Sequence, residues 1–600
     1  MDDVTPTDDW AAVLQERFLS DLMQAEASAQ LTAGERACLQ QVMELQPGEV
    51  HRLMIAAEGG PAADLAGFFI VLQANNKALS AFMFSPVAGL EKFANAPALR
   101  AALEQRLATP VLREDILRFL PIEVRESLTL GHPLKLKRLL IETRVFANRQ
   151  QSIIALQQHN LELIRERLLG LPSLRAVLDQ QLKRQLDQEF QGLDLAPQSL
   201  WVNSYVGGRQ VSGTSLGAAA LRFMARGAWP QDLIREYLSP TVPYVQLQAQ
   251  SPTLDARMQA LVGRATETAQ GAIHEQILSF WASEVEGLSL RTVAQQVMGD
   301  YFFNELLQAR HQRRVGPEQF AELKGLCCAQ PPAGQWRPAR LSLLEQDNAE
   351  VALAGLFNAY VPATQAELFL FSGRTGLQAF SSSVSFKENL LERLKDPRHI
   401  TSLLTHVSRD QQAVLRNMHN VIVEVEMISG DLFEDRVQSI IDKQLRDLRY
   451  LMSTVKGTEL DVNAVVDHAL DVRTLLDPRL MQLSTQGRWS TGLALEREAT
   501  PALTAVPDTQ TLDLVGRKLT ALQSQLALMV SARPSLDSGT LRPLLKRPAT
   551  DFVSDFGQGL RGFTALRAIR CPACQWTCDS RSSEVRCYAM KCMSNGSTSA

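Results

Sequence analysis

Residues 82–110 read FMFSPVAGLEKFANAPALRAALEQRLATP, and residues 369–397 read FLFSGRTGLQAFSSSVSFKENLLERLKDP. The two stretches align without a gap at an offset of 287, and ten of their 29 positions are identical. Each contains a short apolar run, a glycine turn and an amphipathic helical pattern that ends at a proline. Self-similarity at a fixed offset is typical of chains that are built from repeated structural units.

The same offset recurs further along the chain. FANRQQSIIALQ at 146–157 and FEDRVQSIIDKQ at 433–444 share seven of twelve positions at an offset of 287. Upstream, LAGFF at 65–69 matches LAGLF at 353–357 with an offset of 288. Residues that match between copies indicate shared packing, since a catalytic site would not need to be copied. The sequence therefore predicts four segments: an N-terminal helical segment (1–44), a first helical unit (45–330), a second, incomplete copy (337–560) and a cysteine-rich tail (561–600).

Most of the chain has helical periodicity, so we predict a mainly α, multi-helical fold. Two tandem related helical units are expected, each with a small β-hairpin or strand insertion. Thr32 and Glu35 have the spacing of a capping box at a helix start. The apolar run LAGFFIVLQ (65–73) is half the length of a membrane span and is interpreted as a buried helix. The candidate strands are 339–345, 366–372 and 200–211, the last around Gly207-Gly208.

Length and charge limit the classes of function. Six hundred residues exceed what one hydrophobic core can organise. The net charge of −4 gives no electrostatic case for nucleic-acid binding. Neither a P-loop nor a GxGxxG motif occurs, so nucleotide binding has no support. The segment KLKRLLIETR (135–144) is interpreted as a short basic helix face, either solvated or in peripheral contact with an anionic membrane.

Several blocks together resemble a known family. The pattern F-x-F-S-x-x-x-G-L-x-x-F before a helix, and LFEDRVQSIIDKQLRDL at 432–448, are similar to the dermonecrotic-toxin N-terminal domain of large Gram-negative, especially Pseudomonas, proteins. The resemblance covers residues 45–560. It implies the helical N-terminal region of a secreted toxin or effector, which acts in binding, delivery or scaffolding without its own catalytic site. A host-cell target or protein partners are then expected.

The resemblance also bears on location and completeness. The start MDDVTPTDDW lacks the apolar core of a secretory signal, and only Cys38, Cys327 and Cys328 precede the tail, as in proteins folded in a reducing compartment. We expect synthesis in the bacterial cytoplasm and, where export occurs, a leaderless route. Members of the family continue into further modules such as leucine-rich repeats. This sequence shows no such module, so the resemblance leaves open whether the chain is a truncated or frameshifted form of a longer toxin.

Two enzymatic alternatives stay open. GTSLG (213–217) fits the G-x-S-x-G motif of serine hydrolases, with Ser215 as the nucleophile. The alternative role for Ser215 is a helix cap, which we favour because no parallel sheet is evident. The adjacent Cys327 and Cys328 could serve a cysteine-dependent enzyme, although nothing in the sequence indicates a depressed thiol pKa. The histidines, including His399 and His406, are scattered and form no metal motif.

The tail carries the last candidate site. Cys571 and Cys574 form C-x-x-C, and Cys587 and Cys592 follow as C-x4-C, which is a workable spacing for zinc. The counterpart of this stretch in the first unit, 284–305, has no cysteine and has a helical pattern. The favoured interpretation is therefore a disordered or frameshifted tail without a cofactor. A zinc-binding interaction module and disulfides are the alternatives.

Overall fold

The computed structural model describes residues 10–43, 50–75, 78–129, 134–227, 229, 233–250, 253–328, 334–345, 350–364, 367–418, 421–454 and 462–481, and the backbone of short strands within 570–589. The first elements are α1 (Trp10–Ala27), α2 (Ala33–Gln41), β1 (Val50–Ala57), β2 (Ala63–Asn75), β3 (Ala78–Ser85), β4 (Gly89–Phe93), α3 (Ala96–Ala108), α4 (Pro110–Leu117), α5 (Ile122–Thr129), β5 (Leu134–Leu140), α6 (Val145–Leu169) and α7 (Leu174–Glu189). The middle elements are β6 (Trp201–Val206), β7 (Arg209–Ser215), α8 (Leu216–Arg226), β8 (Ile234–Leu238), α9 (Tyr244–Gln250), α10 (Leu254–Ala282), β9 (Glu284–Val285), β10 (Leu288–Ser289), α11 (Leu290–His311) and α12 (Pro317–Gly325).

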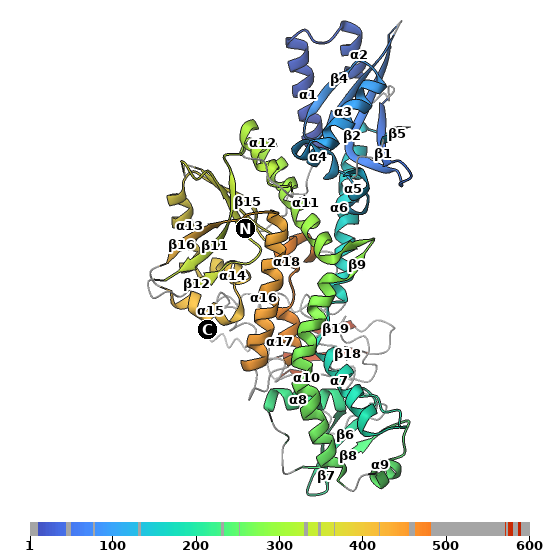
Figure 1. Ribbon diagram of the computed structural model, residues 1–600, viewed down its shortest axis with the longest axis vertical. Coiled ribbons are helices and arrows are strands. Elements are labelled where there is room, and N and C mark those ends of the chain that lie inside the picture. Colours follow the sequence, from blue (N-terminus) through green and yellow to red (C-terminus); the bar gives the residue numbers. More distant parts are fainter. Residues whose placement is uncertain are drawn as a thin grey trace, which may run out of the picture.

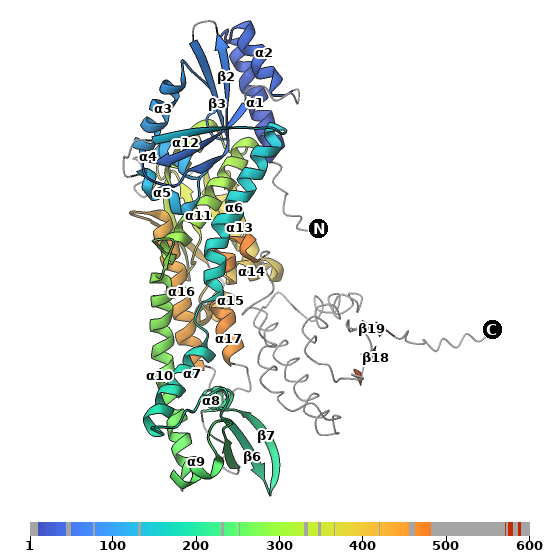
Figure 2. The same cartoon turned by 90° about the vertical axis from the view of Figure 1, so that its right-hand side faces the viewer.

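The remaining elements repeat the order of the first ones. They are β11 (Arg337–Leu344), β12 (Glu350–Ala352), β13 (Phe357–Tyr360), β14 (Leu368–Ser372), β15 (Gly376–Phe380), α13 (Ser383–Lys395), α14 (Pro397–Leu404), α15 (Arg409–Asn417), β16 (Ile422–Met427), α16 (Leu432–Thr454), α17 (Val462–Ala469), α18 (Arg473–Leu476) and the 3-10 helix η1 (Pro478–Met481). The molecule is elongated, and the long helices α6, α10, α11 and α16 run along its axis (Figures 1 and 2). The five-stranded sheet and the three-stranded sheet of β6, β7 and β8 lie at opposite ends. The six-stranded sheet lies to one side (Figure 1).

The first sheet is antiparallel, with the strand order β4-β3-β2-β1-β5, and both of its faces are covered. On one face, α1 and α6 bring Phe18 and Phe146 against Phe69 and Phe84, with ring centroids 5.0–5.9 Å apart. On the other face, Phe68 packs edge-on against the ring of Phe119 at 5.4 Å. The central strand β2 is therefore buried on both sides.

This burial explains the main error of the sequence interpretation. The structure is 57% helical and 21% strand, so the prediction of a mainly α, multi-helical fold is wrong. LAGFFIVLQ is not a buried helix but lies in strand β2. A strand covered on both faces shows no alternation of polar and apolar residues, and periodicity alone cannot distinguish it from a buried helix. Each unit is thus an α/β layer structure in which the strands form the centre.

Other local predictions have mixed outcomes. The strands at 339–345, 366–372 and 200–211 are confirmed as β11, β14 and the hairpin β6–β7. The capping box of Thr32 and Glu35 is also confirmed. The basic stretch 135–144 is not a helix face, because most of it is β5, an edge strand paired only with β1 among the described strands. Lysines on an edge strand discourage pairing with a second chain.

The repeat is visible in three dimensions. The second sheet places β11, β13, β14 and β15 in the order of β1 to β4, and β16 pairs with β11 as β5 pairs with β1. The pairs with identical bounds at an offset of 287 are β1/β11, β4/β15, α3/α13 and α4/α14. In the second copy, the counterpart of β2 is divided into β12 and β13.

A helix that precedes each sheet completes its core. Phe302 of α11 packs against Phe357, Phe371 and Phe433, just as Phe18 of α1 packs in the first copy. A carboxylate on each helix, three residues after the phenylalanine, accepts a backbone N–H that follows a positive-φ glycine. These contacts are Leu90 N–H to Asp21 Oδ2 at 3.0 Å and Leu377 N–H to Glu305 Oε2 at 3.2 Å. The two phenylalanines and the two carboxylates are each separated by 284 residues, so α11 is the structural counterpart of α1.

The long helix of each copy is fixed to the central strand by the same side chains. In the first copy Arg149 is 1% exposed and donates to the Phe68 carbonyl, while Ser152 accepts the Gly67 N–H at 3.0 Å. The second copy repeats this with Arg436 to the Leu356 carbonyl at 2.9 Å and Gly355 N–H to Ser439 Oγ at 2.9 Å. We call this arrangement the arginine–serine clamp. It accounts for the shared arginine and serine of the R-x-Q-S-I-I blocks.

Replacement of Gly67 by alanine tests the clamp. A Cβ at Gly67 would lie 2.9 Å from Ile153 Cδ1, and the backbone φ there is +76°. We expect the free energy of unfolding to fall by about 3 kcal/mol, from overpacking and left-handed strain together. Gly59→Ala is the matched control, because φ is +84° with no atom within 4 Å of the added Cβ. Urea unfolding should show only about 1 kcal/mol there, and equal losses in the two variants would contradict the close approach.

Candidate functional site

The most concentrated polar cluster of the described residues surrounds Asp300 on α11. This carboxylate lies within the apolar run VMGDYFF (297–303) and is only 9% exposed. It accepts hydrogen bonds from Arg118 at 3.0 Å and from Asn160 at 3.0 Å. It also accepts two from Arg125, at 2.8 and 2.7 Å. One buried carboxylate thus joins three side chains from the first unit.

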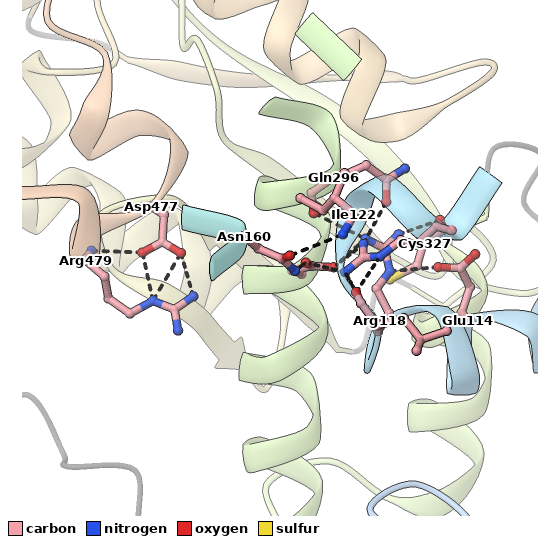
Figure 3. Close-up of polar contacts among 11 residues, drawn as sticks. Glu114, Arg118, Ile122, Asn160, Gln296, Cys327, Asp477 and Arg479 are labelled. Atoms are coloured by element: carbon pink, nitrogen blue, oxygen red, sulfur yellow. Dashed lines mark hydrogen bonds and ion pairs between the residues drawn. The ribbon is translucent and has the colours of Figure 1, made fainter. Parts of the chain in front are cut away.

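The two arginines also bind backbone carbonyls, so each has several partners. Figure 3 shows Arg118 with Glu114, Gln296 and Cys327 around it. Arg118 donates to Glu114 Oε2 at 2.7 Å and to the carbonyls of Gln296 and Cys327. Arg125 donates twice to the Leu120 carbonyl, at 3.0 and 2.9 Å. A buried guanidinium is stable only when its donors are satisfied in this way. Together, Arg118, Arg125 and Asp300 form what we call the junction cluster.

Local backbone chemistry permits this approach. A Cβ at Gly299 would lie 2.6 Å from Arg118 Nη1. Arg118 can therefore approach α11 this closely only because a glycine precedes Asp300. Burial disfavours the charge of Arg118, but Glu114 and Asp300 outweigh it and raise the pKa of the guanidinium further. Arg118 therefore stays charged at every pH at which the protein folds.

A second buried pair reinforces the same contact. Lys324 of α12 donates to both carboxylate oxygens of Asp115, at 2.6 and 2.8 Å. Burial raises the pKa of Asp115, and the charge of Lys324 partly opposes the shift. The rings of Phe119 and Phe303 meet edge-on at 5.9 Å beside these pairs. The helices α4, α5 and α6 of the first copy are thereby bound to α11 and α12 by charge and by apolar packing.

A cavity of about 20 Å³ borders the junction cluster, between Asn160, Asp300 and Arg479. Arg479 donates to Asp477 and to Gln157 Oε1, and its guanidinium lies 5.6 Å from the ring centre of Tyr301. This volume holds about one water molecule and no organic substrate. The arrangement can fix helices relative to one another, and its chemistry is that of a structural joint.

Ser215 takes the helix-cap role. It is the N-cap of α8, is 2% exposed, and accepts the Ala218 N–H at 3.3 Å and a bond from Arg175 at 3.1 Å. The sheet β7-β6-β8 beside it is antiparallel. A nucleophile elbow requires a strand and a helix on a parallel sheet, so this geometry does not match one.

Cys327 and Cys328 follow α12 and are both buried. Burial raises the pKa of both thiols, to about 11 for Cys328. Nucleophilic cysteines need a lowered pKa and access to a substrate. The sequence alternative of a cysteine nucleophile therefore finds neither condition here. The Cys327 carbonyl instead accepts a bond from Arg118 at 3.2 Å.

His406 occupies the position that Phe119 has in the first copy. It is 3% exposed, and its Nδ1 lies 2.8 Å from the Ala354 carbonyl. Its own carbonyl accepts the Ala354 N–H at 2.8 Å, as the Phe119 carbonyl accepts the Ala66 N–H. Burial lowers its pKa to about 4, and the charges of Lys443 and Arg374 add to this effect. The ring is therefore a neutral packing residue.

The cysteines of the tail lie outside the described side chains. The described backbone there comprises β17 (Arg570–Cys571), β18 (Cys574–Asp579) and β19 (Arg586–Ala589). Zinc at Cys571, Cys574, Cys587 and Cys592 therefore stays a prediction. Among the described residues, no group of three or more His, Cys, Asp or Glu side chains could hold a metal ion.

Comparisons with known proteins add no relatives. No protein-family model matches the chain, and no curated protein matches it. The resemblance to the dermonecrotic-toxin N-terminal domain thus stays a prediction. In the described part of the chain, every helix is too short or too polar to serve as a membrane span.

Sequence reasoning missed the junction cluster, although it left a signal. A single carboxylate within VMGDYFF is unusual, because a buried charge needs a partner. Arg118 and Arg125 correspond to Thr405 and Gln412 in the second copy, so only one copy carries these charges. Their contact with Asp300 spans 182 and 175 residues, which no local pattern reveals.

Replacement of Asp300 by asparagine tests the junction cluster. The variant leaves Arg125 buried without its carboxylate, and breaking such a pair costs about 3–5 kcal/mol. We expect a matching drop in the free energy of unfolding in urea. Asp187→Asn removes a partner of Lys183 that is 52% exposed, and should cost less than about 1 kcal/mol. Similar losses for the two variants would show that Asp300 is not a structural joint.

His406 predicts a specific pH dependence. Its folded pKa of about 4 lies below the ordinary 6.5, so the unfolded chain binds more protons as the pH falls below 6.5. Stability is then fully present above this value, and about 2 kcal/mol of the free energy of unfolding is lost between pH 7 and 5. His406→Phe, which installs the residue of the first copy, should remove this slope. The exposed His399→Gln should keep it, and a slope unchanged in His406→Phe would refute the assignment.

Proposed function

We propose that the chain is a binding and scaffolding region of a secreted toxin or effector, which holds binding surfaces at fixed spacing and needs no catalytic site of its own. The observation that carries this proposal is the continuity of the hydrophobic core. One cluster of buried residues extends from Trp10 in α1 to Leu480 in η1, through both copies and the three-stranded sheet. Such a core favours one rigid body over separate domains on linkers.

The placement of the sheets agrees with this role. The five-stranded and three-stranded sheets lie at opposite ends of a shaft of long helices (Figures 1 and 2). The junction cluster fixes the first unit to α11, and α11 simultaneously completes the second unit. A shaft of this kind keeps two end surfaces apart at constant orientation, which suits bivalent attachment to a large target. The family resemblance supplies the expectation that the target belongs to a host cell.

A delivery assay tests the proposal. The full chain, fused to a reporter β-lactamase, is added to cultured mammalian cells loaded with a cytosolic substrate. Attachment and reporter uptake should exceed those of the reporter alone by about tenfold or more, a gain within reach of two-point attachment. Ser215→Ala and Cys327→Ala chains should act as well as the native chain. Failure of the native chain to attach would refute the proposal, and loss of the effect in folded Ser215→Ala would favour the hydrolase alternative.

A further inference from the structure

A hollow lined by arginine and hydroxyl groups lies in the three-stranded end of the molecule, away from the junction cluster. It is bounded by the inner face of the β7-β6-β8 sheet and by one face of α8. Its volume is about 80 Å³, against about 20 Å³ for the cavity at the junction cluster. The hollow is large enough for a small tetrahedral anion with its first waters.

The sheet side of the hollow is polar because of strand register. Ser204 of β6 lies opposite Ser212 of β7 and opposite Arg235 of β8, and Thr214 lies one pleat along on the same face. Three hydroxyl groups and one guanidinium therefore line the same wall. Hydroxyls and guanidinium groups are the side chains that most often bind phosphate oxygens.

The helix side adds positive charge. Arg222 and Arg226 are four residues apart, and both line the hollow from α8. Both side chains are exposed, and neither forms an ion pair with a carboxylate of the described residues. Partial desolvation and the like charge of Arg226 lower the pKa of Arg222, so the pair repels itself in the absence of an anion. Like charges held together on one helix face are destabilising unless a counter-charge is bound.

The third arginine is arranged differently. Arg235 has a side chain only 2% exposed, donates to Asp255 at 3.2 Å, and lies 5.0 Å from the ring centre of Trp229. Its charge is thus compensated by one carboxylate. The indole N–H of Trp229, which lines the same hollow, is buried without a hydrogen-bond partner among the described residues. Arg222 and Arg226 are then two positive charges without a carboxylate partner among the described residues, which matches the charge of a phosphate monoester near pH 7.

We infer that this hollow is a binding site for a phosphate monoester group, held by Arg222 and Arg226 and oriented by the hydroxyls of Ser204, Ser212 and Thr214. The planar guanidinium of arginine can donate two parallel hydrogen bonds to two oxygens of a phosphate, which the ammonium of lysine cannot do. The group can belong to a phosphorylated lipid headgroup or to a soluble organic phosphate. The site is independent of the delivery role, since a chain that attaches to cells without binding phosphate would refute only this inference.

Calorimetric titration of the full chain at physiological salt tests the site, with inorganic phosphate and a soluble inositol phosphate as probes. One saturable site is expected. Arg222→Gln and Arg226→Gln should each raise its dissociation constant about tenfold or more. Arg209→Gln is the matched control, because Arg209 is exposed in the β6–β7 turn of the same sheet and does not line the hollow. It should change the constant by less than about twofold.

Further variants and vesicles complete the test. Thr214→Val keeps the charge and size but removes one hydroxyl, and should weaken binding about threefold or more. Vesicles with phosphatidylinositol phosphate distinguish the two sources: binding that the soluble headgroup competes away indicates a lipid, and binding of soluble phosphate alone indicates a metabolite. Absence of saturable binding to all probes would refute the site. Equal weakening by Arg209→Gln and Arg222→Gln would also refute it, because general charge attraction would then explain the binding.

Discussion

The structure depends on the carboxylate of Asp300, which connects a helix to two units at once. One side of α11 carries Phe302 into the aromatic core of the second copy, and the adjacent Phe303 contacts Phe119 of the first. Between these contacts, Asp300 neutralises Arg118 and Arg125 in an interior where their charges could not otherwise remain. Without it, α11 could still complete the second copy, but Arg125 would be buried without its carboxylate partner, and Arg118 would keep only Glu114.

The arginine–serine clamp explains why the two copies are similar in the R-x-Q-S-I-I blocks. Arg149 and Arg436 are among the largest fully buried side chains, and each satisfies a carbonyl that follows a positive-φ glycine. These glycines are Gly67 in strand β2 and Gly355 in the break between β12 and β13. Each glycine must lack a side chain because Ile153 or Ile440 occupies the space beside it. Arginine, serine, isoleucine and glycine therefore constrain one another, and a change at one position is costly unless the others change with it.

The sequence allowed the repeat, three strand regions and the capping box at Thr32 to be predicted, because each depends on residues close together or on identity at one offset. It did not reveal that LAGFFIVLQ is a strand, since burial on both faces removes the alternation that identifies strands. The role of α1 was also hidden. Phe18 and Asp21 of α1 correspond to Phe302 and Glu305 of α11. The offset between them is 284, not the 287 of the repeat. The junction cluster was beyond reach because its partners are more than 100 residues apart.

The two copies differ at the position of Arg125, where the first copy binds Asp300 of α11. In the first copy, Arg125 donates to the Leu120 carbonyl and also to Asp300. In the second copy, Gln412 donates to the Val407 carbonyl at 3.3 Å, as Arg125 donates to the Leu120 carbonyl. Gln412 carries no charge that could pair with Asp300. The bond to the Leu120 or Val407 carbonyl supports the turn that both copies need, whereas the bond from Arg125 to Asp300 joins the first copy to α11. Duplicated units thus conserve the contacts that fold each unit and diverge at those that join them.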